Sequence, residues 1–186
     1  MDKFRGTDFY GAQSSHPVLI GHHFATAFYP GLLRGIFQIL PKSKIEGIID
    51  IGSGKGLGIC IFKKSGIAKV GGIEFQKELV EICQKNLAKV GVAGDFIYCG
   101  DAKDFVKYEG YNTLYLYNSL PCNVLAKTLK NFIDHDKDNG GIQTPKYLIS
   151  VNPVCHQISL DAGFVEIGRF FHFASHDTVV VYTATG

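Results

Sequence analysis

A glycine cluster between a buried strand and a helix constrains the fold of this chain more than any other feature. The run 48–51 is apolar apart from Asp50, which is typical of a buried parallel strand. Gly52, Gly54 and Gly56 follow it in a G-x-G-x-G pattern, and a helical segment comes next. A strand that passes through a glycine turn into a helix opens a βαβ unit. The pattern therefore predicts a parallel α/β sheet with a ligand-binding turn at the carboxyl end of this strand.

The spacing of the glycines separates three kinds of nucleotide-binding turn. A phosphate-binding P-loop requires a glycine five residues before the Gly-Lys pair and a Ser or Thr after it, but these positions hold Ile49 and Gly56. A dinucleotide fingerprint requires G-x-G-x-x-G, and its third glycine position holds Leu57. What remains is G-x-G-x-G with Asp50 two residues before the first glycine.

The rest of the chain alternates strand-like and helical runs. Strand patterns cover 48–51, 68–74, 95–99, 111–117 and 147–151, and helical stripes cover 76–90 and 123–134. This order predicts a parallel sheet with helices on both faces. The last two β runs, 164–173 and 178–183, are separated by four residues, which allows only an antiparallel hairpin. The sheet is therefore expected to finish with an antiparallel strand.

The chain is expected to form a single domain of two parts. Residues 1–43 are mostly helical in pattern, with breaks at Pro17, at Pro30 and Gly31, and at Pro41, and are interpreted as a helical cap on the substrate side of the sheet. Residues 44–186 are interpreted as the core. The run 134–145 is the one clear loop between core elements. His22 and His23 lie in the cap, where either imidazole is a candidate base or a packed or solvated helix residue.

Charge and cysteine content narrow the class of protein. The formal net charge is +2, and the basic residues are dispersed, so a nucleic-acid partner is not expected. The most apolar stretch, 18–40, is interrupted by His22, His23, Pro30 and Arg34, and the first residues are not expected to act as a signal peptide. We therefore expect no membrane span. We also expect no bound metal, because neither the acids at 134–138 nor His172 and His176 have the spacing of a metal site. The cysteines have no C-x-x-C spacing and are predicted to be reduced thiols in a cytoplasmic protein: Cys60, Cys83, Cys99, Cys122 and Cys155.

The glycine turn and two later acids resemble the motifs of the class I S-adenosylmethionine (SAM)-dependent methyltransferases. Glu74 ends the second predicted strand, where the resemblance implies that its carboxylate binds the ribose hydroxyls. Gly100–Asp101–Ala102 follows the third strand and resembles the adenine-side motif. The resemblance implies a Rossmann-like three-layer sandwich, a seven-stranded mostly parallel sheet with an antiparallel last strand, and S-adenosylhomocysteine as the product. The implied cofactor-binding residues are Asp50, Gly52, Ser53, Gly54, Gly56, Glu74, Phe75, Asp101, Ala102 and Asn118.

A closer resemblance is to small bacterial methyltransferases with a tyrosine-rich fourth strand that runs into Asn-Pro-Phe and a second Asn-Pro after the fifth. Here the second, Asn152–Pro153, is intact, whereas Asn118 is followed by Ser-Leu-Pro. The resemblance implies that the Asn118 amide orients an attacking amine, with Tyr117 beside it. The alternatives are that Asn118 only satisfies a turn and that Tyr117 only packs against the sheet.

The resemblance implies methyl transfer to an unidentified acceptor, with a nitrogen, in a protein lysine or another amine, as the leading candidate. Small molecules and nucleic acids are the other acceptor classes. A second hypothesis is a module that binds SAM or S-adenosylhomocysteine without catalysis, because the loop after Asn118 departs from the family pattern. Substrate contacts are expected from 10–41 and from the loops after Asn118 and Asn152.

Overall fold

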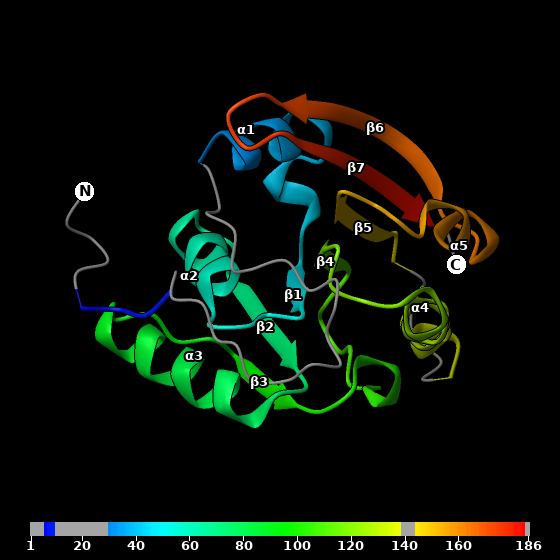
Figure 1. Ribbon diagram of the computed structural model, residues 1–186. Helices are drawn as coiled ribbons and strands as arrows, with labels where there is room; N and C mark the ends of the chain where they lie inside the picture. The colour runs from blue at the N-terminus through cyan, green and yellow to red at the C-terminus, as the bar shows by residue number, and fades with distance from the viewer. Residues whose placement is uncertain (1–5, 10–29, 139–143, 185–186) are drawn as a thin grey trace.

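A computed structural model describes residues 6–9, 30–138 and 144–184. The histidine pair at 22 and 23 and most of the expected cap lie outside these residues. Within the described part, one sheet forms the centre of the molecule, and helices lie against both of its faces (Figure 1).

The sheet has seven strands in the order β3-β2-β1-β4-β5-β7-β6. Six strands run in the same direction, and β7 is antiparallel to both of its neighbours, β5 and β6. The predicted sheet, with its antiparallel last strand, is thus confirmed. The strands are β1 Gly47–Ile51, β2 Lys69–Glu74, β3 Phe96–Cys99, β4 Thr113–Tyr117, β5 Lys146–Val151, β6 Val165–His172 and β7 Asp177–Ala184.

Two hydrophobic clusters, one on each face of the sheet, make the three layers. On one face the sheet packs against α1 Pro30–Ile39, α2 Leu57–Lys64 and α3 Lys77–Lys89. On the other it packs against α4 Cys122–Asp138 and α5 His156–Asp161, together with the short helix η2 Ala102–Asp104. A further short helix, η1 Lys42–Lys44, leads into β1. No helix among the described residues is both long and apolar enough to cross a membrane.

Helix α1 lies along the face of the sheet and against β6. Its glycines allow the close approach, because a Cβ added to Gly35 would lie 2.4 Å from Cζ of Phe170. At the start of the helix, a Cβ added to Gly31 would lie 2.5 Å from the ring of His172, which is the last residue of β6. The helix therefore starts at the carboxyl edge of the parallel strands and runs down the face of the sheet.

Two elements differ from the sequence-based expectation. The loop predicted to start at residue 134 starts later, because α4 continues to Asp138. An i, i+4 ion pair between Lys130 and Asp134 stabilises this last part of the helix, and the composition of the run gave no sign of it. Helix α5 was not predicted, since it has only six residues and too short a periodic pattern.

Candidate active site

Three residues other than glycine have a left-handed backbone in the described part of the chain, and all three lie at one edge of the sheet. Asn118 (φ 41°) follows β4, Asn152 (φ 51°) follows β5, and His176 (φ 56°) precedes β7, which pairs with β5. Such conformations cost about 1–3 kcal/mol each and are concentrated at functional sites. This is also the carboxyl edge of the parallel strands, where ligands bind in open α/β sheets. Backbone geometry therefore places a candidate site here.

The predicted glycine turn lies at the same edge, between β1 and α2. The backbone N–H groups of Gly52 and Ser53 both donate to the carbonyl oxygen of Ile73, at 2.8 and 3.0 Å, which ties the turn to the end of β2. Gly52 has φ 72°, and a Cβ there would lie 2.6 Å from Cβ of Ser119. The Ser119 hydroxyl donates to the carbonyl oxygen of Ile51 at 2.7 Å. Glycine at position 52 is therefore what allows the loop after β4 to close on the end of β1.

The middle glycine of the turn faces open space. Gly54 has φ 52°, and a Cβ added there would meet nothing nearer than the carbonyl oxygen of Gly52 at 3.9 Å. Its N–H donates to Oε2 of Glu74 at 3.0 Å. Ser53 is buried, and its Oγ has no hydrogen-bond partner. An open backbone surface with a carboxylate held beside it fits a ligand that has hydroxyl and ammonium donors.

The carboxylate of Glu74 is held at the end of β2 by two backbone groups. Besides the Gly54 bond, its Oε1 accepts from the N–H of Gln76 at 2.9 Å. The side chain is 5% exposed, so its orientation is fixed before any ligand binds. The N–H of Gly100 donates to the carbonyl oxygen of Glu74 at 2.9 Å, which places the Gly100–Ala102 motif next to it. The structure therefore brings two of the predicted cofactor motifs together.

Asp50 lies beneath the turn instead of in front of it. A Cβ added to Gly58 would be 2.2 Å from its Oδ2, so the carboxylate points toward the first turn of α2. Burial raises the pKa of Asp50 to about 7, and the negative charge of Glu74 adds to the increase. Asp50 is therefore partly protonated near neutral pH, and it lies beneath the glycine turn within the electrostatic influence of Glu74.

The remaining predicted cofactor residues occupy different environments. Phe75 is 55% exposed although it is a large apolar side chain, so its ring is available to a ligand beside Glu74. Ala102 is 4% exposed and packs in the core, which leaves only its backbone for a ligand. Burial opposes ionisation of Asp101, but hydrogen bonds from Lys103 and the charge of Lys103 outweigh it and lower the pKa of Asp101. Asp101 is therefore ionised and paired with Lys103.

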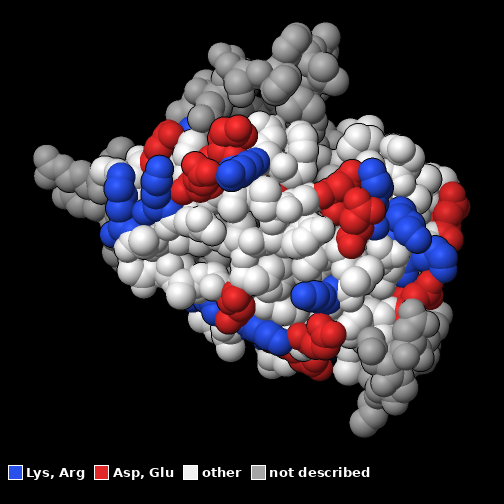
Figure 2. Space-filling model, turned by 90° about the horizontal axis from the view of Figure 1, so that it is seen from below, with Lys and Arg blue, Asp and Glu red and all other residues white. Residues whose placement is uncertain are grey.

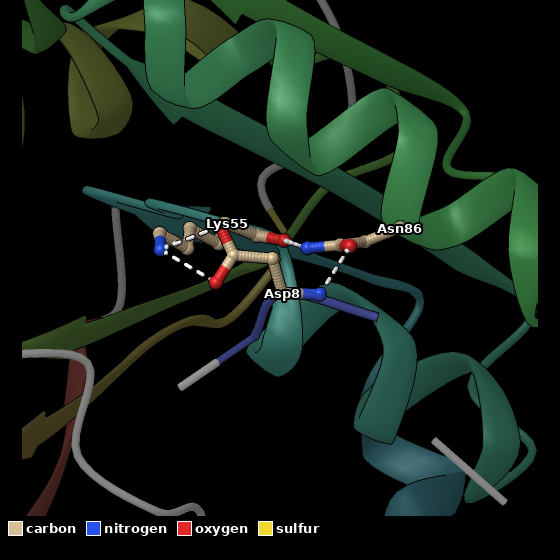
Figure 3. Close-up of polar contacts among 3 residues, drawn as sticks. All are labelled: Asp8, Lys55 and Asn86. Atoms are coloured by element: carbon tan, nitrogen blue, oxygen red, sulfur yellow. Dashed lines mark hydrogen bonds and ion pairs between the residues drawn. The ribbon is translucent and has the colours of Figure 1, made fainter. Parts of the chain in front are cut away.

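A polar cluster that the sequence did not predict joins the N-terminal residues to the glycine turn (Figure 3). The ammonium of Lys55 contacts both carboxylate oxygens of Asp8 at 2.9 Å. The buried amide of Asn86 accepts from the N–H of Asp8 at 2.9 Å and donates to the carbonyl oxygen of Lys55 at 3.1 Å. Lys55 is the lysine of the Gly-Lys pair in the rejected P-loop pattern, and the structure shows that it binds an acid of its own chain.

The two predicted acceptor-side residues differ in their contacts. Asn118 is half-buried, and its side-chain amide has no hydrogen bond within the described ranges. Tyr117 donates its hydroxyl to Oδ1 of Asp177 at 2.5 Å. Asp177 begins β7 in what the sequence shows only as a polar turn, so no sequence signal pointed to it. In the described ranges no group of three or more His, Cys, Asp or Glu side chains is arranged to hold a metal.

A disulfide joins the two loops that start at Asn118 and Asn152. It pairs Cys122, the first residue of α4, with Cys155, which precedes α5, at a Cα–Cα distance of 5.4 Å. The prediction of five reduced thiols is therefore wrong for this pair. The two cysteines are 33 residues apart in the sequence, so no local pattern predicts that they pair. They meet because β4 and β5 are neighbouring parallel strands. Reduced thiols were one of the arguments for a cytoplasmic location, and the disulfide removes that argument, so the location stays a prediction. The other three cysteines are free: Cys60, Cys83 and Cys99.

No protein-family model matches the sequence, and no curated protein matches it. Solved structures do match the fold. A mutant of MtNAS in complex with SAM superposes with a TM-score of 0.66 at 17% identity, over 84% of this chain and 61% of that chain. This chain thus spans less than two thirds of the MtNAS chain.

Two shorter proteins are covered more completely. Magnesium protoporphyrin IX methyltransferase from Synechocystis PCC 6803, with bound SAM, matches with a TM-score of 0.60 at 14% identity, over 83% of this chain and 78% of that chain. A ribosomal protein L11 methylase from Lactobacillus delbrueckii subsp. bulgaricus matches with a TM-score of 0.61 at 14% identity, over 83% and 77%. With the strand order and the glycine turn described above, these matches show that the chain has the fold of the class I SAM-dependent methyltransferases.

Proposed function

We propose that this protein is a SAM-dependent methyltransferase that transfers the methyl group to a nitrogen, with a protein lysine or another amine as the acceptor. The observation that carries the proposal is the glycine turn with the buried Glu74 hydrogen-bonded to Gly54, at the edge where the strained Asn118 and Asn152 also lie. A ligand that spans from Glu74 to the end of β4 would have its reactive end beside Asn118. Several proteins of this fold bind SAM, among them the two that were solved with it.

In this proposal the residues of the chain position the reactants. Glu74 would accept hydrogen bonds from the ribose hydroxyls, and the turn at Gly52–Gly54 would leave room for the amino-acid part of the cofactor. Phe75 and Asp101 would contact the adenine. The cofactor supplies a methyl group that is already activated on a sulfonium, so alignment is the main task of the protein, and alignment can lower a barrier by several kcal/mol. Asn118 would orient the lone pair of the acceptor amine.

The surface charge supports an acceptor other than nucleic acid. On the face shown in Figure 2, acidic and basic side chains alternate along the rim, and uncharged surface lies between them. Among the described residues on this face, no continuous basic stripe of the kind that follows a phosphate backbone is present. The net charge of +2 agrees with this.

Calorimetry tests the cofactor part of the proposal. We expect SAM and S-adenosylhomocysteine to bind the purified protein with micromolar affinity, and NAD and ATP not to bind. Binding of NAD without binding of SAM would overturn the proposal. Incubation with radiolabelled SAM and a host-cell lysate then tests catalysis. A labelled protein band supports a protein lysine as the acceptor, and a small soluble product with the label on nitrogen supports another amine. A nuclease-sensitive product, or a label on oxygen or carbon, contradicts the proposal, and no product favours the non-catalytic module.

Cofactor affinity should depend on pH through Asp50. The pKa of Asp50 is about 7 in the folded protein and 3.8 in the unfolded chain. Its contribution to the stability of the fold is therefore complete below pH 3.8 and is lost as the pH rises through 7. Over the same rise in pH the Asp50 carboxyl of the folded protein becomes ionised. Because Asp50 lies beneath the turn, its ionised carboxylate would attract a cationic ligand across the glycine turn instead of through a direct contact. We therefore expect the association constant for SAM to rise about tenfold between pH 6 and pH 8.

Asp50→Asn provides the control for this pH profile, because it removes the titrating proton with little change in shape. The amino group of SAM titrates equally with both proteins, so the difference between the two calorimetric profiles isolates Asp50. Superimposable profiles for wild type and Asp50→Asn would contradict this role.

A further inference from the structure

A buried carboxylate outside the cofactor turn connects three strands at the carboxyl edge. Asp177, the first residue of β7, is 3% exposed. Its Oδ1 accepts hydrogen bonds from the hydroxyl of Tyr117 at 2.5 Å and from Nδ2 of Asn152 at 2.7 Å. Tyr117 ends β4, and Asn152 follows β5, so the tyrosine reaches Asp177 past the end of the intervening strand.

The orientation of the Asn152 amide fixes the role of Asp177 as an acceptor. Oδ1 of Asn152 accepts from the N–H of Thr178 at 2.9 Å, so the amide group that faces Asp177 must be the NH₂ donor. Two donors therefore converge on a single oxygen of Asp177. This arrangement holds the other oxygen, Oδ2, in a fixed position.

Oδ2 of Asp177 is buried and has no hydrogen-bond partner. Leaving such a group unsatisfied destabilises the fold, and the cost is larger for a charged group than for a neutral one. In the described part of the chain no Lys, Arg or His forms an ion pair with Asp177, although buried carboxylates are normally paired with a cation. The protein thus holds an oriented, buried acceptor without its donor, and this acceptor is hydrogen-bonded to Tyr117, the residue before Asn118.

We propose that Asp177 binds the protonated amine of the methyl acceptor, so that the site selects cationic nitrogen acceptors over hydroxyl and carboxylate acceptors. The inference rests on the proposed function and names its substrate class. An ammonium supplies both of the missing components, a hydrogen-bond donor for Oδ2 and a positive charge. A neutral hydroxyl supplies no charge, and a carboxylate would be repelled.

The chemical balance of the step is simple. The bound ammonium first releases one proton to water. The nitrogen lone pair then forms the bond to the methyl carbon while the carbon–sulfur bond breaks, and the bonding pair stays on sulfur as a neutral thioether. Asp177 keeps the acceptor in place, and Asn118, the residue after Tyr117, orients the lone pair of the acceptor nitrogen.

The test uses two small probes that differ only in the ammonium group at the end of the side chain. They are N-acetyl-lysine N-methylamide and its neutral counterpart N-acetyl-norleucine N-methylamide, titrated by NMR into the full chain with saturating S-adenosylhomocysteine. Wild type should bind the lysine probe about tenfold more tightly than the norleucine probe, the effect expected of one charged hydrogen bond.

Three variants separate charge from structure. Asp177→Asn keeps the Oδ1 acceptor and replaces only Oδ2, so it should lose the preference for the lysine probe. Asp161→Asn, an exposed acid at the end of α5, should keep it. Tyr117→Phe removes one donor but leaves the charge, so it should also keep a preference. Thermal unfolding of each variant reports whether it folds. If Asp177→Asn does not fold, the comparison of the two probes on the wild-type protein still tests the proposed preference for a cationic acceptor.

Either of two results overturns the inference: wild type binds both probes equally, or Asp177→Asn discriminates as well as wild type does. Calorimetry with SAM on the same samples keeps this distinct from the proposed function. SAM binding without probe discrimination rejects the role of Asp177 alone, whereas no SAM binding rejects the proposed function.

Discussion

Replacing Glu74 by alanine should weaken SAM binding about 100-fold. A hydrogen bond to a charged group contributes about 1.5–3 kcal/mol, and the proposed ribose contact involves two hydroxyls. The loss of one of these hydrogen bonds in full and of the other in part corresponds to a roughly 100-fold weaker affinity. The substitution also removes the acceptor that holds the N–H of Gly54 at 3.0 Å, and the glycine turn would lose its support. Calorimetric titration with SAM measures the change directly.

Glu78→Ala is the matched control for this substitution. Glu78 is exposed in the first turn of α3, four residues from Glu74, and has the same chemistry without the backbone contacts. It should bind SAM as wild type does. Unchanged affinity in Glu74→Ala would remove Glu74 from the cofactor site. A fall in the melting temperature without a change in SAM affinity would restrict Glu74 to supporting the turn.

Reduction of the Cys122–Cys155 disulfide should destabilise the protein by about 3–4 kcal/mol. The bond closes a loop across 33 residues, and the chain-entropy estimate for a loop of that length gives this value. For a chain of this size the melting temperature should fall by roughly 8–15 °C, which differential scanning calorimetry with and without dithiothreitol measures. The disulfide also joins the loops that carry Asn118 and Asn152. After reduction, these two loops should be the first part of the protein to unfold locally.

Two cysteine variants make this result specific. Cys122→Ser with Cys155→Ser should melt at the temperature of the reduced protein and should not respond to dithiothreitol. Cys99→Ser, at an exposed free thiol, should behave as wild type. A thiol titration of the denatured, unreduced protein should count three thiols, and a count of five would show that the disulfide does not form.

Local patterns account for the framework of the fold. The β-branched run before Asp50 and the glycines after it identify a strand and a turn, because each demands a backbone conformation that few other residues adopt. The four-residue turn before Thr178 forces a hairpin, since a parallel crossover needs far more chain. The position of Glu74 at a strand end predicted a carboxylate beside the turn, and the structure holds it there through Gly54.

Contacts between distant segments could not be read in the same way. Lys55 and Asp8 are 47 residues apart, Tyr117 and Asp177 are 60 apart, and neither pair leaves a periodic signal. The disulfide follows from the adjacency of β4 and β5, which is a property of the strand order.

The sequence by itself thus determined the strand–turn–helix framework and the residue types at the cofactor turn, because those depend on backbone preferences within a few residues. Only the tertiary structure decided which side chains face one another across the carboxyl edge. Asp177 is the clearest case: in the sequence it is one polar residue of a turn, and in the folded protein it is a buried acceptor held by Tyr117 and Asn152. Burial and partner geometry arise when β4, β5 and β7 come together, and no local pattern records them.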